Sequence, residues 1–306
     1  MSPEGEKDEP LGRQSAGRVD DSVGFSDDRR SQFFRCQIWD PSSADLIPSK
    51  KEVLNPCRRL DLLAERRLLS GLQTSIPLEF GYYGEEEGLV FQGNERLFAL
   101  IDAVDGSDLI LRGRELFGAI SLAWFDPWSG QLLSAVVVDL VSSANLIWSW
   151  RAEVGSFWQN AFLPAPQPLV MPKEPREDPF FATVSIKPQM ELKFENQYDK
   201  VLKWLVEQYP RARFSKSHCG SPGVCRAAHG AIDALLHLYG GQGHDVIGPA
   251  AILKGAGGLN VALQSGEELQ IKIDFSGDLA EQLEERHPFV SGNPYWVDQI
   301  IKLLAS

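Results

Sequence analysis

The spacing of apolar residues predicts the first elements of the chain. Residues 61–73 carry leucines at helical spacing with arginines between them, a pattern that predicts a helix. The apolar run of residues 96–102 predicts a buried strand that ends on an aspartate. Between these two elements, residues 81–88 (GYYGEEEG) combine glycine and acidic residues, so we expect a turn-rich loop there.

A meander of strands is expected next. Apolar segments alternate with short turns rich in proline, glycine, serine or asparagine, which is typical of consecutive antiparallel strands. The predicted strands lie within residues 116–126, 132–140, 145–150 and 155–162. Residues 163–179 then hold six prolines and are predicted to form a linker.

Helices and strands are mixed beyond the linker. Strands are expected in segments that start at residues 180 and 231, and helices within residues 196–209, 243–258 and 293–305. Another helix is expected around residue 221, with Ser221 as its N-cap and Pro222 as its first residue. This mixture predicts an α/β (α+β) fold of two layered halves.

Three regions are expected along the chain. Residues 1–50 are rich in serine, glycine, proline and charged residues, so we expect a disordered or irregular tail. Residues 51–165 are expected to form an N-terminal α+β half with a metal-binding motif. Residues 178–306 are expected to form a C-terminal α/β half. No clear element is predicted for residues 31–57.

The charge of the chain bears on its partners. The formal net charge is −12 and the isoelectric point is about 5.0, which disfavours nucleic acid polymers and anionic membrane surfaces. No apolar run approaches 18 residues, so no membrane span is predicted. The cysteines form no CxxC pair and the first residues lack an apolar signal core, which favours reduced thiols and a cytoplasmic protein.

Carboxylates fall in three clusters that can carry chemistry. The first is residues 85–87, the second is Asp102, Asp105 and Asp108 in the segment IDAVDGSD, and the third is Asp245. Oxygen-only clusters suit hard cations such as magnesium, manganese or calcium. Each cluster alone has an ordinary explanation, as a solvated loop, a strand-end turn or a helix N-cap. Only the ordered set favours a metal site.

The set of motifs resembles a known family. Four segments match in order the motifs of the inositol monophosphatase family, which belongs to a magnesium-dependent, lithium-sensitive phosphatase superfamily that includes fructose-1,6-bisphosphatase. They are YGEEEG, IDAVDGSD, CGSPGVCRAAHGAIDA and HDVIGPAAILKGAGG. Weaker matches are GSFWQN and FVSGNP. The resemblance covers residues 60–306 and implies a layered αβαβα sandwich.

The resemblance also implies roles for individual residues. Two or three Mg²⁺ ions, with Mn²⁺ as an alternative, would be held by Glu85, Asp102, Asp105, Asp245 and the backbone carbonyl of Val104. Glu85 and Ser107 would act on the attacking water. Substrate contacts would come from Gly106, Ser107, Gly220 and Ser221.

Several residues depart from the family pattern. His244 stands where tryptophan is common, Gly255 where glutamate is common, and Ala103 replaces a proline. The segment HLYGGQG (residues 237–243) lacks the acid that often contacts a substrate hydroxyl. Asp61 matches a family aspartate without the preceding threonine. The five histidines show no ligand pair and are expected in surface or structural roles. No role is assigned to Asp108.

These features predict a magnesium-dependent phosphomonoesterase. It would hydrolyse a small sugar, inositol or related phosphate by attack of a metal-activated water, since hard cations and positioning suffice for phosphoryl transfer. Fructose 1,6-bisphosphate and 3′-phosphoadenosine 5′-phosphate are alternative substrates. A non-catalytic scaffold or regulatory protein on the same fold is the alternative class. The resemblance also allows a homodimer.

Overall fold

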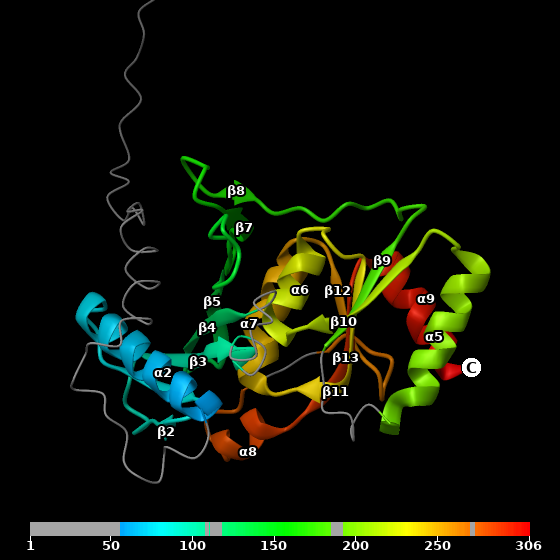
Figure 1. Cartoon of the computed structure of the whole chain (residues 1–306). Helices are drawn as coiled ribbons and strands as arrows, with labels where there is room; N and C mark the ends of the chain where they lie inside the picture. The colour runs from blue at the N-terminus through cyan, green and yellow to red at the C-terminus, as the bar shows by residue number, and fades with distance from the viewer. Residues whose placement is uncertain (1–55, 108–109, 111–117, 185–191, 270–272) are drawn as a thin grey trace, which may run out of the picture.

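Two β-sheets and the helices around them form the described part of the chain (Figure 1). The computed structural model describes residues 56–107, 110, 118–184, 192–269 and 273–306. The expected N-terminal tail (residues 1–50) and Asp108 lie outside these residues.

The first sheet has eight strands in the order β2-β1-β3-β4-β5-β6-β7-β8. Only β1 and β3 pair in parallel; the other neighbours are antiparallel, as expected for a meander. The strands are β1 (Phe80–Gly84), β2 (Gly88–Val90), β3 (Leu97–Asp105), β4 (Ala119–Asp126), β5 (Gln131–Asp139), β6 (Ile147–Arg151), β7 (Gly155–Gln159) and β8 (Gln167–Pro168).

The second sheet has five strands in the order β10-β9-β11-β13-β12. The central strands β9 and β11 are parallel, and β13 runs antiparallel to both of its neighbours. The strands are β9 (Phe180–Val184), β10 (Arg213–His218), β11 (Ala234–Gly241), β12 (Leu259–Ala262) and β13 (His287–Gly292).

Helices form the remaining layers (Figure 1). Helix α2 packs on the outer face of the first sheet, α6 and α7 lie between the sheets, and α5 and α9 cover the outer face of the second sheet. The helices are α2 (Pro56–Ser75), η3 (Leu192–Phe194), α5 (Glu195–Gln208), α6 (Gly220–Ala228), α7 (Gly243–Gly255), α8 (Leu279–Glu284) and α9 (Pro294–Ala305).

Strand β3 shows why the layers form. Successive side chains of a strand point to opposite faces of its sheet. Phe98 and Leu100 enter the cluster between the sheets, whereas Ala99, Ile101 and Ala103 pack against the α2 side. Both faces of the strand are therefore buried, which explains its continuous apolar run. The predicted layered αβαβα sandwich is confirmed.

The second sheet repeats this arrangement on β11. Leu235 joins the core between the sheets, whereas Leu236 and Leu238 face the outer helices α5 and α9. On α9, the buried face carries Trp296 and Ile300. The core between the sheets draws residues from both halves of the chain. The division into residues 51–165 and 178–306 stays a prediction.

Two local predictions were wrong. Residues 80–84 form strand β1 rather than part of a loop, because this short segment pairs with β3 and buries alternate residues; only residues 85–87 form the turn. Cys219 rather than Ser221 is the N-cap of α6, because the helix already begins at Gly220. The sequence patterns also missed β10, β12, β13 and α8, which are short.

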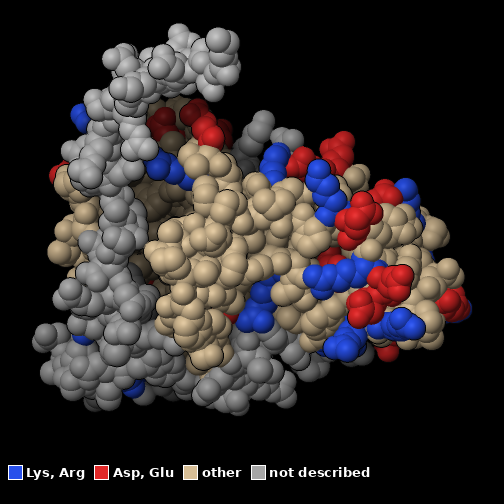
Figure 2. Space-filling view, turned by 90° about the horizontal axis from the view of Figure 1, so that it is seen from above, with Lys and Arg blue, Asp and Glu red and all other residues tan. Residues whose placement is uncertain are grey.

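Charged side chains of both signs are mixed on the surface. At the end of the molecule formed by α5 and α9, Lys and Arg side chains lie among Asp and Glu side chains, beside a largely uncharged area (Figure 2). Such mixing cancels much of the local field, so the acidic excess of the chain does not gather on this visible end. Among the described helices, none combines the length and apolarity that a membrane crossing needs.

Candidate metal centre

A β-bulge at the end of β3 orients the first two acidic residues. Asp102 pairs with Ser121 of β4, but Asp105 pairs with Ala119, so three steps on one strand match two on the other. On a regular strand, residues three apart point to opposite faces. The extra residue of a bulge changes this alternation. Asp102 and Asp105 can therefore face the same site.

Helix α7 brings the third carboxylate. Carboxylate oxygens of Asp102, Asp105 and Asp245 lie within 4.8 Å of one another. Asp245 lies in the first turn of α7, where its Oδ2 accepts a hydrogen bond from the backbone N–H of Gln242 at 3.1 Å. The residue is thus part of a helix cap and of the acidic cluster at once. Three predicted ligands from two segments that are far apart in sequence therefore converge.

The first turn of α6 holds two of these residues in place. The backbone N–H of Ser221 donates to Oδ2 of Asp105 at 2.6 Å, and the Ser221 hydroxyl donates to the backbone carbonyl of Asp245 at 3.2 Å. Ser221 is fully buried. A Cβ at Gly220 would lie 3.5 Å from the same Asp105 oxygen, an ordinary van der Waals contact. The predicted substrate contacts of Gly220 and Ser221 stay a prediction.

Glu85 lies in the turn after β1, and α2 anchors that turn. The carboxylate of buried Glu65 accepts hydrogen bonds from the backbone N–H groups of Glu86 and Glu87 at 3.1 and 2.9 Å. A Cβ at Gly84 would overlap the Glu65 carboxylate, so only glycine fits there. Helix α2 therefore holds the backbone of the turn directly after Glu85.

Ser107 and Asp61 form a pair beside this turn. The Ser107 hydroxyl donates to Oδ2 of Asp61, on α2, at 3.0 Å. Gly106 has φ of 88°, a conformation that favours glycine, and it turns the chain between β3 and Ser107. The side chain of Asp61 is thus brought from the helix to the end of β3. The N–H of Val104 donates to Oδ1 of Asp102 at 3.0 Å. The predicted role of the Val104 carbonyl as a metal ligand stays a prediction.

Burial and neighbouring charges raise the pKa values of Asp102, Asp105 and Glu85. Burial, followed by the charges of Glu85, Asp105 and Asp245, raises the pKa of Asp102 well above its usual range. Burial and then the charge of Asp245 raise the pKa of Asp105 to about 7, although the Ser221 hydrogen bonds oppose this. Desolvation raises the pKa of Glu85 to about 7 as well, but this residue keeps exposed surface, so solvent screens the shift.

This electrostatic arrangement fits a divalent cation. Crowded, desolvated carboxylates repel one another and are costly without a positive partner. The donors of Asp102, Asp105 and Asp245 are all oxygens, the donor type that magnesium and manganese favour. A bound cation would reverse the local charge and keep the carboxylates ionised.

Two buried histidines lie beside the cluster, and the sequence analysis missed this. The Nε2 atom of His244 is 3.4 Å from Oδ1 of Asp245, and its ring stacks on Tyr83 at a centroid distance of 6.1 Å. His237 on β11 is also buried; burial lowers its pKa to about 4, while the charge of Asp245 opposes this shift. The one available signal was the adjacency of His244 and Asp245 in the segment GHDV.

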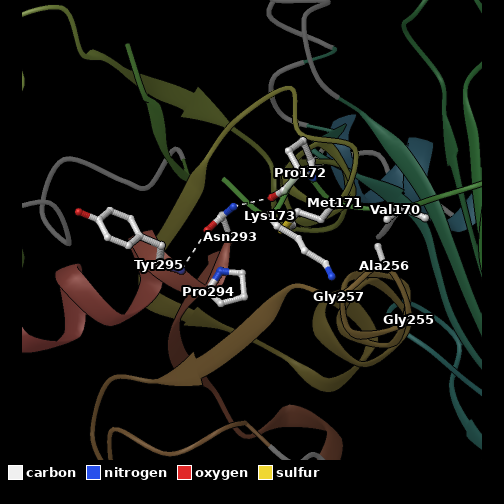
Figure 3. A pocket seen from close by; sticks show the side chains of 10 residues that line it. All are labelled: Val170, Met171, Pro172, Lys173, Gly255, Ala256, Gly257, Asn293, Pro294 and Tyr295. Carbon is white, nitrogen blue, oxygen red and sulfur yellow. Dashed lines mark hydrogen bonds between the residues drawn. The ribbon is translucent and has the colours of Figure 1, made fainter. Parts of the chain in front are cut away.

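A pocket lies at the opposite end of α7 (Figure 3). Its volume is about 320 Å³. Gly255, which lines the pocket, is ten positions after Asp245 on α7, which corresponds to about 15 Å along the helix axis. The Asn293 side chain donates to the carbonyl of Pro172 at 2.7 Å and accepts from the N–H of Tyr295 at 2.9 Å. The pocket is therefore distinct from the candidate metal centre.

The fold and the cluster define a layered αβαβα protein with an acidic site where β3, α6 and α7 meet. The model of the inositol monophosphatase family matches residues 33–290. The chain belongs to this family, which supports phosphatase activity. No curated protein matches the chain by sequence.

Solved structures share the fold at low identity. Inositol monophosphatase II from Staphylococcus aureus aligns with a TM-score of 0.61 and 18% identity, over 89% of each chain. SuhB from Mycobacterium tuberculosis aligns with a TM-score of 0.60 and 17% identity, over 90% of this chain and 91% of that one. An IMPase/NADP phosphatase complexed with Mg²⁺ and phosphate aligns with a TM-score of 0.56 and 15% identity, over 79% of each chain.

Proposed function

We propose that this protein is a magnesium-dependent phosphomonoesterase that hydrolyses a small sugar, inositol or related phosphate. The observation that carries the proposal is the convergence of Asp102, Asp105 and Asp245, whose oxygens lie within 4.8 Å of one another. The family assignment supports the reaction class. The related IMPase/NADP phosphatase that holds Mg²⁺ and phosphate supports the cofactor.

The acidic residues hold the cofactor in this proposal. Asp102, Asp105 and Asp245 would bind it, with Glu85 and the Val104 carbonyl completing the set. When bound, magnesium supplies positive charge that makes water more acidic and offsets the charge of the transferring phosphoryl group. The hydrogen bonds of Ser221 keep the Asp105 carboxylate in position.

Ser107 and Glu85 would position the attacking water. Because the Ser107 hydroxyl donates its hydrogen to Asp61, its oxygen keeps lone pairs that can accept a hydrogen bond from water. The Glu85 carboxylate is a hydrogen-bond acceptor that can orient the same water. Asp61 fixes the orientation of the Ser107 hydroxyl and is a positioning residue.

The end of β11 and the residue that follows it support the substrate class. Residues 239–242 carry no acid, and Arg286 holds this segment by donating to the Gly240 carbonyl and to Oε1 of Gln242, each at 3.0 Å. The guanidinium of Arg286 also lies over the Tyr239 ring, 4.5 Å from its centroid. A site without the hydroxyl-binding acid favours a broader class than inositol phosphate alone. Fructose 1,6-bisphosphate and 3′-phosphoadenosine 5′-phosphate stay in the panel of candidates.

Phosphate release tests the proposal. The full chain is incubated with inositol 1-phosphate, several sugar phosphates, fructose 1,6-bisphosphate and 3′-phosphoadenosine 5′-phosphate, with Mg²⁺ and with EDTA. We expect release from at least one substrate only with Mg²⁺. No magnesium-dependent release from any of them would overturn the proposal and favour a scaffold or regulatory protein.

The proposal also includes the binding partners, the cellular localisation and the oligomeric state. The acidic net charge supports a small substrate over nucleic acid polymers or membranes. We propose a cytoplasmic protein that can form a homodimer. Light scattering of the purified chain at several concentrations tests the oligomeric state.

A further inference from the structure

His244 is a buried side chain with unmet hydrogen-bonding capacity. The residue is 3% exposed, and neither of its ring nitrogens has a hydrogen-bond partner among the residues that the structure describes. A buried polar group without a partner is costly, and native structures rarely leave one unexplained. A ligand bound beside this imidazole would remove the cost.

The position of the ring points to the acidic cluster. Its Nε2 atom lies 3.4 Å from Oδ1 of Asp245, a carboxylate that belongs to the cluster. Tyr83 stacks on the ring with an interplanar angle of 26°, which limits its rotation. Tyr83 precedes the turn that carries Glu85.

We propose that Nε2 of His244 is a metal ligand, at a subsite that it shares with Asp245. The separation of 3.4 Å between Nε2 and Oδ1 is short enough for both atoms to reach one ion with bonds of about 2.0–2.2 Å. This inference rests on the proposed metal-dependent function and deepens it.

A nitrogen donor changes which cation the centre prefers. Magnesium takes oxygen ligands almost exclusively, whereas imidazole also suits first-row transition metals such as manganese. In this chain a histidine stands where the family commonly has tryptophan, which offers no lone pair for a metal. The centre would therefore bind Mn²⁺ more tightly than Mg²⁺ by a larger margin than an all-oxygen site.

Pulsed electron paramagnetic resonance of bound Mn²⁺ tests the ligand directly and needs no substrate. The metal-free full chain is loaded with less than one equivalent of Mn²⁺, and electron spin echo modulation reports a coordinated ¹⁴N nucleus. We expect this coupling in the wild type, its loss in His244→Gln, and its retention in His237→Gln. His237 is the matched control because it is also a buried imidazole near Asp245.

Calorimetric titration adds a second readout. We expect His244→Gln to weaken Mn²⁺ binding roughly tenfold or more, by analogy with losses in metal-site shells, and to change Mg²⁺ binding less. His244→Trp restores the residue that is common in the family. It replaces His244→Gln in both experiments if His244→Gln does not fold. Thermal unfolding without metal shows which variants are folded.

Two results would overturn the inference while leaving the proposed phosphatase intact. In the first, the wild type binds Mn²⁺ but shows no ¹⁴N coupling, and Asp105→Asn weakens Mn²⁺ binding as expected for an acidic ligand. The other is coupling that disappears in His237→Gln but persists in His244→Gln. A wild type that binds no Mn²⁺ overturns the inference as well. The proposed function fails separately, if Mg²⁺ gives no phosphate release.

Discussion

An aspartate lies near each end of helix α6, and the surroundings of the two differ. Near its C-terminal end, Asp139 accepts a hydrogen bond from the Arg226 guanidinium at 2.9 Å. The same carboxylate accepts the backbone N–H groups of Val141 and Ser142, both at 2.9 Å. This charge is compensated within the chain.

The N-terminal end of α6 shows the opposite arrangement. There Asp105 accepts the Ser221 N–H but faces two further carboxylates, Asp102 and Asp245. Burial and then the charge of Asp245 raise the pKa of Asp105. The contrast teaches that buried acids alone do not indicate a metal site. Mutual crowding of carboxylates favours one, because crowded carboxylates need protons or a bound cation to offset their repulsion.

The largest effect is expected from Asp105→Asn. Removing one ligand charge should lower magnesium-dependent phosphate release by about a thousandfold, since metal ions contribute several kcal/mol to the transition state. The fold should persist, because the substitution relieves repulsion with Asp102 and Asp245. Phosphate release and metal-free thermal unfolding check both parts. Activity near the wild-type level would refute the ligand assignment.

Arg226→Met tests the compensated end. It leaves Asp139 buried without its cation, so the free energy of unfolding should fall by about 3 kcal/mol. Urea unfolding at pH 7 measures this change. In metal-free protein, we expect Arg226→Met to lower the free energy of unfolding and Asp105→Asn not to lower it. Equal destabilisation by both variants would remove the distinction between the two ends.

The pH dependence of magnesium stabilisation sharpens the comparison. The pKa values of Asp105 and Glu85 are raised to about 7 in the folded chain, above those of the unfolded chain. Their contribution to metal-free stability is present below about pH 4 and is lost as the pH rises to about 7. Saturating Mg²⁺ should therefore raise the melting temperature by about 5 °C or more at pH 8 and by less at pH 5.

Scanning calorimetry with MgCl₂ and with EDTA measures this difference. Asp105→Asn is the control and should show a smaller Mg²⁺ effect at pH 8. An Mg²⁺ effect that is larger at pH 5 than at pH 8 would contradict the expected sign.

The smallest effect is expected from Glu65→Gln. Glu65 is buried, yet backbone N–H groups of Glu86 and Glu87 satisfy its carboxylate. Glutamine keeps one acceptor oxygen and places an NH₂ group against the other N–H, which loosens the turn around Glu85. Magnesium affinity should fall about tenfold, as for other residues that hold ligands in place. Titration calorimetry measures it; an unchanged affinity would show that the turn needs no anchor.

Much of the fold was predictable, and the failures have a common cause. The helix of residues 61–73 and the strands of the meander have long periodic patterns, and they were confirmed as α2 (Pro56–Ser75) and β3 to β7. Strand β1 was missed because a five-residue segment with two buried glycines lacks a pattern of its own. It is a strand because β3 offers hydrogen-bonding partners. The short β12 and β13 pair in the same non-local way.

The sequence by itself determined the residue types of the candidate site. Oxygen ligands for a hard cation were predicted from local sequence alone. The signals were Asp102 and Asp105 at the end of an apolar run, Gly106 after them, and Asp245 in the segment GHDV. The continuous apolar run of residues 96–102 also indicated a buried strand, because consecutive side chains of a strand point to opposite faces.

The tertiary structure alone decided how these residues meet. The bulge in β3 turns Asp102 and Asp105 toward one site, and packing of α6 and α7 between the sheets brings Asp245 to them. The same packing buries His244 beside that carboxylate without a hydrogen-bond partner among the described residues. Register shifts and helix placement depend on contacts between distant segments, and local sequence carries no record of those contacts.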